Sequence, residues 1–164
     1  MLRLILPDRR CCAFRRAMMA DPATMAYNAP WFPPEGTIPF PEEEWDAFLA
    51  GCRDREPEAF LGFLENEEGL LVGEVNWHDY GQAMGIVIKA EHRGRGSGRE
   101  GLELLKQRAF AHPEIPYLEN NFESARDHAL ALHLRAGFVP AGRDQNGYLV
   151  LRCMNLNGGQ GSIP

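Results

Sequence analysis

Residues 86–105, IVIKAEHRGRGSGREGLELL, decide how the rest of the chain is interpreted. The stretch opens with the apolar residues Ile86, Val87 and Ile88. Their β-branched side chains predict a buried strand. A basic, glycine-rich turn follows at 93–98, and Leu102 and Leu105 then recur with helical spacing. A strand, a glycine turn and a helix start in this order predict an anion site, because the first amides of a helix have no internal partners.

The turn at 93–98 contains the side chains and amides that we expect to contact the anion. They are Arg93, Gly94, Arg95, Gly96, Ser97 and Gly98. Glycine lets the backbone approach phosphate oxygens and adopt positive φ, whereas arginine supplies a planar fork of donors. An ordinary glycine-rich surface turn would have the same composition, so other parts of the chain must decide between the two interpretations.

The composition is that of a globular protein, with 45% hydrophobic and 24% charged residues in a chain of 164. We expect one domain at 1–154, followed by a flexible polar tail at 155–164. The formal net charge of -6 disfavours nucleic-acid binding. No window is apolar enough for a signal peptide or a membrane span, so we expect a cytoplasmic protein without a membrane partner. The four cysteines lack the spacing of a metal site, and no metal is expected.

The predicted order of elements is β-α-α-β-β-β-α-β-α-β-β. Strands are expected at 2–6, 59–64, 70–77, 82–89, 117–122, 138–141 and 148–154. Helices are expected at 8–19, at 41–53, from the glycine turn to about residue 111, and from a capping box at Ser124 to Gly137. The short connections between 59 and 89 require antiparallel hairpins. The sequence therefore predicts an α+β fold, a mixed and mostly antiparallel twisted sheet flanked by helices.

A dinucleotide-binding motif fits part of the same turn. Gly96, Gly98 and Gly101 have the spacing of the nucleotide fingerprint, and Glu119 lies about 20 residues further on. That fold, however, requires parallel βαβ units around the motif, whereas the strand before this turn ends an antiparallel meander. A nicotinamide-dinucleotide-binding protein is therefore the weakest of the alternatives.

The pattern Arg93-x-x-Gly96-x-Gly98 resembles the cofactor signature of the GNAT superfamily of acyl-CoA-dependent N-acyltransferases. Residues 129–138, ALALHLRAGF, are similar to the family's second signature, a helix that ends in Leu-Tyr-x-x-x-Gly-Phe. The stretch at 27–45 resembles a bacterial subgroup of the family. The resemblance extends over roughly residues 1–154 and includes the order of the elements.

This resemblance implies the transfer of an acetyl group from acetyl-CoA to a primary amine of a small molecule or peptide, by direct attack on the thioester. The pyrophosphate of coenzyme A would bind the backbone amides of 93–98. The pantetheine arm would pair, like an extra strand, with the backbone of 86–88. The fourth and fifth strands of the family splay apart, and the thioester lies in the gap between them.

Attack on the thioester requires a base for the amine. An alkyl ammonium has a pKa of roughly 10.4, so a side chain must remove its proton near neutral pH, often through water. Glu119 is the first candidate because it is expected on the fifth strand, near the gap. Glu74 and His78, which share one face of the third strand, are the next candidates.

His133 lies where the family usually has a proton-donating tyrosine. An imidazole, with an unperturbed pKa of roughly 6.5, can donate a proton to the leaving thiolate, so His133 is predicted to be the acid. Tyr117 and Tyr148 are the alternatives. The same departure from the family pattern leaves open a second function, an acyl-CoA-binding module without catalysis.

The acceptor is expected to lie against the proline-rich stretch around 27–32. Carboxylates are concentrated between 35 and 74, which hints at a cationic amine such as a polyamine, an aminoglycoside or a peptide amine. The apolar strands at the C-terminus are expected to favour a homodimer.

Overall fold

The structure of the protein is a computed structural model that describes residues 1–28 and 35–156. Its strands are β1 (Arg3–Ile5), β2 (Phe60–Glu65), β3 (Leu71–His78), β4 (Ala83–Ile88), β5 (Tyr117–Phe122), β6 (Val139–Arg143) and β7 (Leu149–Met154). Its α-helices are α1 (Arg9–Met19), α2 (Pro22–Met25), α3 (Trp45–Gly51), α4 (Ser97–Ala109) and α5 (Asp127–Arg135). Apart from the additional short helix α2, this order of strands and α-helices is the one predicted from the sequence.

Helix α2 was not predicted, and it begins directly after α1, at the pair Asp21-Pro22. Asp21 caps it, because its carboxylate accepts hydrogen bonds from the amides of Ala23 and Thr24, both at 3.2 Å. Pro22 follows as the first helical residue, a position that proline tolerates because its missing N–H has no helical partner there. The Asp21-Pro22 pair therefore ends α1 and starts a new helix.

Helix α5 begins later than predicted. Its N-cap is Arg126, which makes no capping hydrogen bond through its side chain, so the capping box expected at Ser124 does not form. The predicted end is confirmed, because Gly137 follows the last turn with a φ of 86°. The helix predicted at 41–53 is also shorter, since Glu42–Glu44 form a 3-10 turn ahead of α3.

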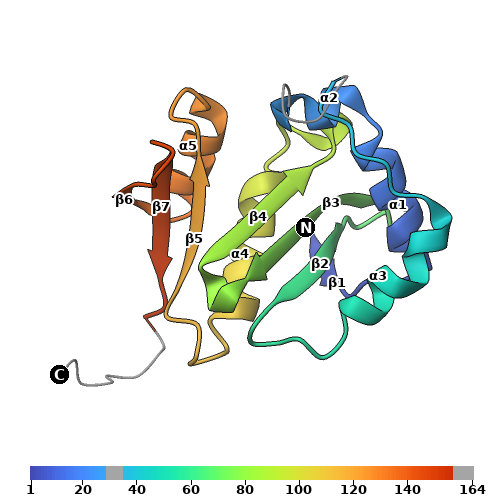
Figure 1. Cartoon of the computed structure of the whole chain (residues 1–164), viewed down its shortest axis with the longest axis horizontal. Coiled ribbons are helices and arrows are strands. Elements are labelled where there is room, and N and C mark those ends of the chain that lie inside the picture. Colours follow the sequence, from blue (N-terminus) through green and yellow to red (C-terminus); the bar gives the residue numbers. More distant parts are fainter. Residues whose placement is uncertain (29–34, 157–164) are drawn as a thin grey trace.

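The strands form two antiparallel sheets instead of one. The first has the order β1-β2-β3-β4 and the second has the order β5-β7-β6. In the described part of the chain, β4 and β5 lie side by side without strand pairing (Figure 1). The two strands are close near their starts, where Gly81 packs on the carbonyl of Tyr117, and they diverge toward their carboxyl ends. This divergence is the splay that the family resemblance implied.

Helix α4 packs behind the first sheet, and α1 and α3 lie on its opposite face (Figure 1). The close approach of α4 depends on Gly101, where a Cβ would lie 2.6 Å from Cδ1 of Leu64 and 3.2 Å from Cδ1 of Ile86. Gly101 is therefore a packing residue inside the helix. This packing explains the third glycine of the dinucleotide motif. The βαβ unit which that motif requires is also missing, because β4 and β5, the strands before and after α4, do not pair within the residues that the structure describes.

Six of the twelve carboxylates between 35 and 74 form ion pairs with arginines in the described part of the chain. The pairs are Glu42 and Asp46 with Arg9, Glu65 with Arg3 and Arg10, Glu56 with Arg108, Glu58 with Arg55, and Glu74 with Arg15. Many of these arginines lie on α1, which faces the acidic part of the chain. Half of these carboxylates are therefore matched by arginines within the fold, which weakens the hint of a cationic acceptor.

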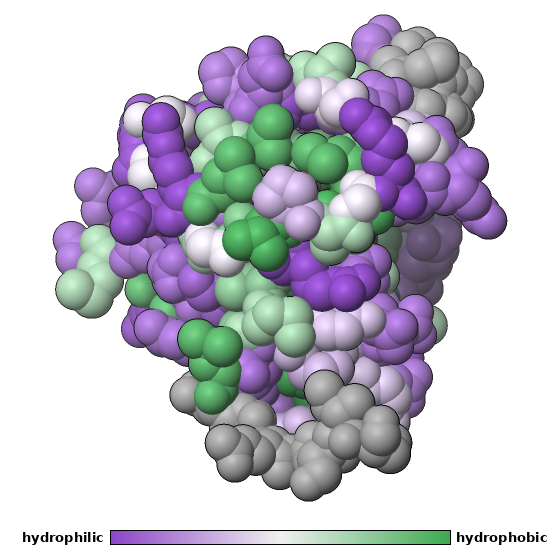
Figure 2. Space-filling model, turned by 90° about the vertical axis from the view of Figure 1, so that its left-hand side faces the viewer, coloured by the Kyte–Doolittle hydropathy of each residue, from purple (hydrophilic) through white to green (hydrophobic). Residues whose placement is uncertain are grey.

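The side of the molecule that carries β6 and β7 has apolar residues gathered near its middle and polar residues around them (Figure 2). Val139 and Met154 on these strands and Leu134 on α5 are exposed. This is the region in which a homodimer was expected, and the dimer stays a prediction. The tail beyond 156 lies outside the described residues.

No helix in the ranges 1–28 and 35–156 is long and apolar enough to cross a membrane. Within these same ranges, no group of three or more histidine, cysteine, aspartate or glutamate side chains is arranged to hold a metal ion.

Candidate active site

The edge of β4 that faces the gap carries backbone groups that do not pair with β3. The amide of Lys89 donates to the carbonyl of Val72 at 3.0 Å, so these two residues form a hydrogen-bonded pair between β4 and β3. Along an antiparallel ladder, hydrogen-bonded pairs alternate with pairs whose backbone groups point away from the partner strand. Val87 is therefore bonded to β3, whereas the N–H and C=O groups of Ile86 and Ile88 point into the gap. The carbonyl of Ile88 confirms this direction, because it accepts from Nε of Arg93 at 2.9 Å.

The edge of β5 that faces β4 also carries backbone groups that do not pair with its own sheet. The amide of Asn155 donates to the carbonyl of Pro116 at 2.9 Å, so alternation places the backbone of Leu118 and Asn120 in the ladder with β7. The backbone groups of Glu119 and Asn121 then point toward β4. Two unpaired strand edges therefore face one another, and an extended ligand arm can pair with either of them.

The glycine turn lies at the open end of this gap and leads into α4. Gly94 and Gly96 have φ angles of 75° and 85°, which side chains other than glycine rarely adopt. No described atom lies within 4 Å of a Cβ built on either glycine, so the backbone is approachable there. The amides of Ser97 and Gly98 begin α4 and have no acceptor within the helix. The predicted geometry of an anion site is therefore present at 94–98.

Arg93 is engaged elsewhere. Its guanidinium donates to the carbonyls of Ala23 at 3.2 Å and Thr24 at 2.8 Å, and its amide donates to Ala90 at 3.1 Å. The side chain therefore ties the turn to the end of α2, and it is not free to hold a phosphate in this arrangement. Arg95 and Arg99 are exposed and, within the described residues, have no ion-pair partner.

Gly98 has a role that the sequence did not indicate. A Cβ at this position would lie 3.1 Å from Cδ2 of Leu132 on α5. We expected Gly98 to be small so that phosphates could approach, but its missing side chain lets the first turn of α4 contact α5.

His133 is buried between two aromatic rings, those of Phe122 and Phe138. Its Nδ1 lies 2.8 Å from the carbonyl of Ala129, which can only accept, so Nδ1 carries the proton. Its Nε2 lies 3.0 Å from Nδ2 of Asn120 and accepts from that amide. Burial also lowers the pKa of His133, which favours the neutral ring. In this arrangement His133 has no free proton for a thiolate, and the ring fixes the orientation of Asn120.

The protonation state of His133 can be tested directly by NMR. Because burial lowers its pKa, the ring should gain its second proton at a lower pH than free histidine does, and the neutral ring should carry its proton on Nδ1. Free histidine in the same buffer should titrate near pH 6.5. Nitrogen chemical shifts of the ring report both the charge and the tautomer. A ring that gains a proton above about pH 6 would restore His133 as a donor.

Glu119 lies on β5 with its side chain partly buried. Its Oε2 accepts two hydrogen bonds from Arg152, from Nη2 at 2.5 Å and from Nε at 2.8 Å. The guanidinium of Arg152 is held in turn over the ring of Tyr117, 4.2 Å from its centroid. The other oxygen, Oε1, makes no hydrogen bond to a described residue, so it is open to a water or a ligand.

Glu74 lies on the face of β3 that α1 covers, and it forms an ion pair with Arg15. The carboxylate is almost fully buried, and burial raises its pKa although Arg15 opposes the shift. Its Oε2 has no hydrogen-bond partner in the described part of the chain. A buried carboxylate oxygen without a partner is costly, and the nearby charge of Arg15 offsets part of that cost.

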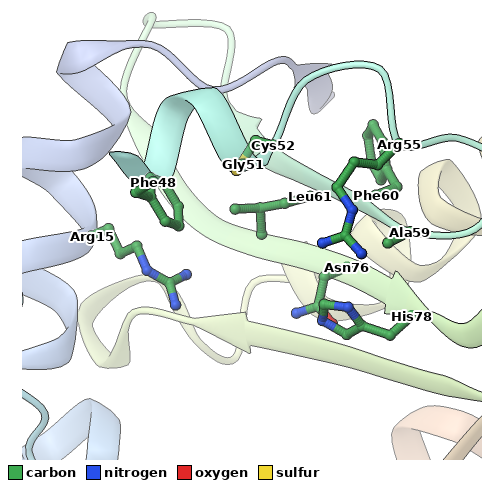
Figure 3. Close-up of a pocket in the computed structure, with 10 residues that line it drawn as sticks. All are labelled: Arg15, Phe48, Gly51, Cys52, Arg55, Ala59, Phe60, Leu61, Asn76 and His78. Carbon is green, nitrogen blue, oxygen red and sulfur yellow. The ribbon is translucent and has the colours of Figure 1, made fainter. Parts of the chain in front are cut away.

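A cavity of about 290 Å³ lies beside this ion pair, between α1, α3 and the strands β2 and β3 (Figure 3). It is lined by Arg15, Phe48, Gly51, Cys52, Arg55, Ala59, Phe60, Leu61, Asn76 and His78. Asn76 connects the cavity to β4, because a Cβ on Gly85 would lie 3.0 Å from Nδ2 of Asn76. The cavity therefore adjoins the strand that borders the gap. The alternation of Glu74, Asn76 and His78 indicated this face, but the sequence did not reveal Arg15 and Arg55 above it.

Arg126 spans the open end of the gap. Its guanidinium lies 4.9 Å from the ring centroid of Tyr27, near α2, and 5.7 Å from that of Phe122 on β5. The two halves of the molecule therefore meet there through stacked side chains. Most of the proline-rich stretch against which the acceptor was expected, residues 29–34, lies outside the described residues.

Comparisons with known proteins agree with this geometry. A family model described as the acetyltransferase (GNAT) domain matches residues 2–139. An acetyltransferase of the GNAT family from Streptococcus pneumoniae has a similar structure, with a TM-score of 0.75 and 18% identity over 94% of this chain and 99% of that one. Spermidine N-acetyltransferase from Vibrio cholerae, solved with CoA and spermine, has a TM-score of 0.69 and 19% identity over 92% of each chain. No curated protein matches the chain.

The match to the family model covers most of the chain, and it includes both the glycine turn and the helix that ends at Gly137. The fold has the antiparallel sheets and flanking helices of the GNAT structures. The protein therefore belongs to the GNAT acetyltransferase family and is an acyltransferase.

Proposed function

We propose that the enzyme transfers an acetyl group from acetyl-CoA to the primary amine of a small acceptor, by direct attack of the amine on the thioester. The observation that carries this proposal is the gap between β4 and β5. Its unpaired edges lead directly to the glycine turn and the start of α4. A ligand that combines an extended arm with a pyrophosphate fits this arrangement.

In this proposal the amides of 94–98 hold the pyrophosphate, and Arg95 and Arg99 add positive charge nearby. The pantetheine arm pairs with the backbone of Ile86 and Ile88, while Val87 stays in the ladder with β3. Arg93 acts indirectly, because its hydrogen bonds to α2 fix the turn in place. The N-terminal end of α4 contributes partial positive charge at the same position.

We propose Glu119 as the base, acting through a water at Oε1. Arg152 holds the carboxylate by its other oxygen, which orients the group without occupying it. Asn121 does not hold this water in the present arrangement, because its amide donates to Asp144 at 2.7 Å. We assign to His133 the positioning of Asn120. The leaving thiolate, with a pKa of roughly 8.5, can depart without a strong acid.

The assay follows the release of free thiol from acetyl-CoA in the presence of a panel of primary amines. We expect release that depends on the amine and exceeds the hydrolysis measured without it. Binding of coenzyme A without any release above hydrolysis would favour the second candidate, an acyl-CoA-binding module without catalysis. The neutral, buried ring of His133 is the observation that supports this second candidate.

Replacing Gly96 with valine should weaken coenzyme A binding by about 10- to 100-fold, because the side chain covers the amides that hold the pyrophosphate. The positive φ adds strain of about 1–2 kcal/mol to the fold. Gly69→Val is the matched control, since Gly69 has a φ of 78°, equal space around its Cβ, and a place in the turn between β2 and β3, outside 93–98. Calorimetric titration with coenzyme A measures both variants. Equal losses of affinity in the two would contradict the assignment of this turn.

A further inference from the structure

The polar groups of the cavity between α1, α3 and β3 favour an anion. Arg15, Arg55, Asn76 and His78 line it with hydrogen-bond donors, and none of its described lining residues is acidic. The charge of Arg15 is matched by Glu74, which lies beside the cavity. The charge of Arg55 is the one that remains for a ligand.

Arg55 has only a weak partner of its own. Its Nη2 lies 3.3 Å from Oε1 of Glu58, and both side chains are exposed, so this contact holds the guanidinium loosely. The side chain extends from the segment after α3 toward Asn76 and His78 on β3 (Figure 3). These three side chains therefore approach the same space from two different elements.

The remaining walls of the cavity are apolar. Phe48 comes from α3, and Phe60 and Leu61 come from β2. The ring of Phe60 is stacked on Trp77, with centroids 4.7 Å apart, on the side of the sheet that α4 covers, so Leu61 is the β2 side chain on the same face as Asn76. A volume of about 290 Å³ suits a small molecule with a compact apolar part better than a peptide segment.

We propose that this cavity is the acceptor site and that it selects a small primary amine that also carries a carboxylate, as a free amino acid does. The carboxylate lies against Arg55 and His78, and the amine lies toward Asn76 and β4. This inference rests on the proposed acetyl transfer. A polyamine, which carries only positive charges, is disfavoured by Arg55, whose charge is held only loosely by the exposed Glu58. The acceptor class therefore differs from that named for the spermidine N-acetyltransferase with the same fold.

The test compares amino acids with their decarboxylated counterparts, for example phenylalanine with phenethylamine, and includes spermidine as a purely cationic amine. We expect kcat/KM to be at least about tenfold higher for the amine that carries the carboxylate, since the guanidinium–carboxylate hydrogen bonds are charge-assisted. Arg55→Glu should abolish or reverse this ratio. Arg53→Glu is the matched control, with the same change of charge on an exposed neighbour that does not line the cavity.

A binding measurement separates failure of this inference from failure of the proposed function. The melting temperature is measured with coenzyme A and each amine, in the wild type and in both variants. A carboxylate-dependent rise that Arg55→Glu removes supports the acceptor site even if no thiol is released. Amine-dependent thiol release with a preference for spermidine or phenethylamine, unchanged in Arg55→Glu, overturns it. A melting temperature that no amino acid raises, together with no amino-acid turnover, also overturns it.

Discussion

Replacing Glu119 with glutamine should lower kcat by about 10²- to 10⁴-fold, the range found when a general base is removed. Glutamine keeps the shape of the side chain and an acceptor oxygen for Arg152, so β5 and β7 should remain in register. What is lost is the ability to take a proton from the amine. The KM for acetyl-CoA should change little, because Glu119 makes none of the proposed contacts to the pyrophosphate. Steady-state kinetics at saturating acetyl-CoA measures both quantities.

The dependence on pH distinguishes a base from a merely structural residue. An alkyl amine has a pKa of roughly 10.4, so its neutral fraction grows as the pH rises. The deficit of Glu119→Gln should therefore shrink between about pH 7 and pH 9. Glu123→Gln, an exposed change nearby, is the control and should behave as the wild type does. If Glu74→Gln shows the pH-dependent loss and Glu119→Gln does not, the base lies on β3.

Replacing Arg15 with methionine should lower the free energy of unfolding by about 3–5 kcal/mol near neutral pH. Methionine keeps contacts with Phe40 and Phe48, whose rings the Arg15 guanidinium now faces at 5.7 and 5.2 Å. The loss arises because the carboxylate of Glu74 stays buried without its only described ion-pair partner. Arg9→Met, which breaks exposed ion pairs with Glu42 and Asp46, should cost less than about 1 kcal/mol. Urea unfolding curves measure both changes.

The cost of Arg15→Met should increase with pH. Burial already raises the pKa of Glu74, and removal of the arginine raises it further, so the folded state keeps this proton to a higher pH than the unfolded state does. Between the two pKa values the unfolded state binds fewer protons, and stability falls as the pH rises. The loss should therefore be smaller at about pH 5 than at about pH 8. Adding Glu74→Gln to the variant should remove this pH dependence, and a dependence that persists would refute the explanation.

The order of strands and helices could be predicted from the sequence, because local residue patterns determine each element. Alternation along β3, the apolar run at 86–88 and Gly137 each indicate one element. The Asp21-Pro22 pair was the exception, since the same two residues can end one helix or cap the next. The splay between β4 and β5 was predicted only through the family resemblance. Nothing in the individual patterns of β4 and β5 reveals that they lie side by side without pairing.

The site was harder to predict from the sequence, because several of its side chains contact residues on other elements. The glycines of the turn were expected to allow positive φ, and Gly94 and Gly96 adopt it, whereas Gly98 does not. Arg93 was expected to face the anion, but its acceptors are at the end of α2, 69 and 70 residues away. His133 likewise acquires its tautomer from Ala129 and Asn120. These contacts depend on how the elements pack, which residue spacing does not specify.

The division of the sheet also has a consequence for how the molecule avoids self-association. Unpaired strand edges are templates onto which a strand of another chain can add. The outer edges here are poor templates, because β1 has three residues and β6 contains Pro140 and an irregularity beside it. The better edges, those of β4 and β5, face each other inside the molecule (Figure 1). The edge strand of another protein's sheet therefore cannot reach the inner edges of β4 and β5, whereas a single extended chain can enter the space between the two sheets.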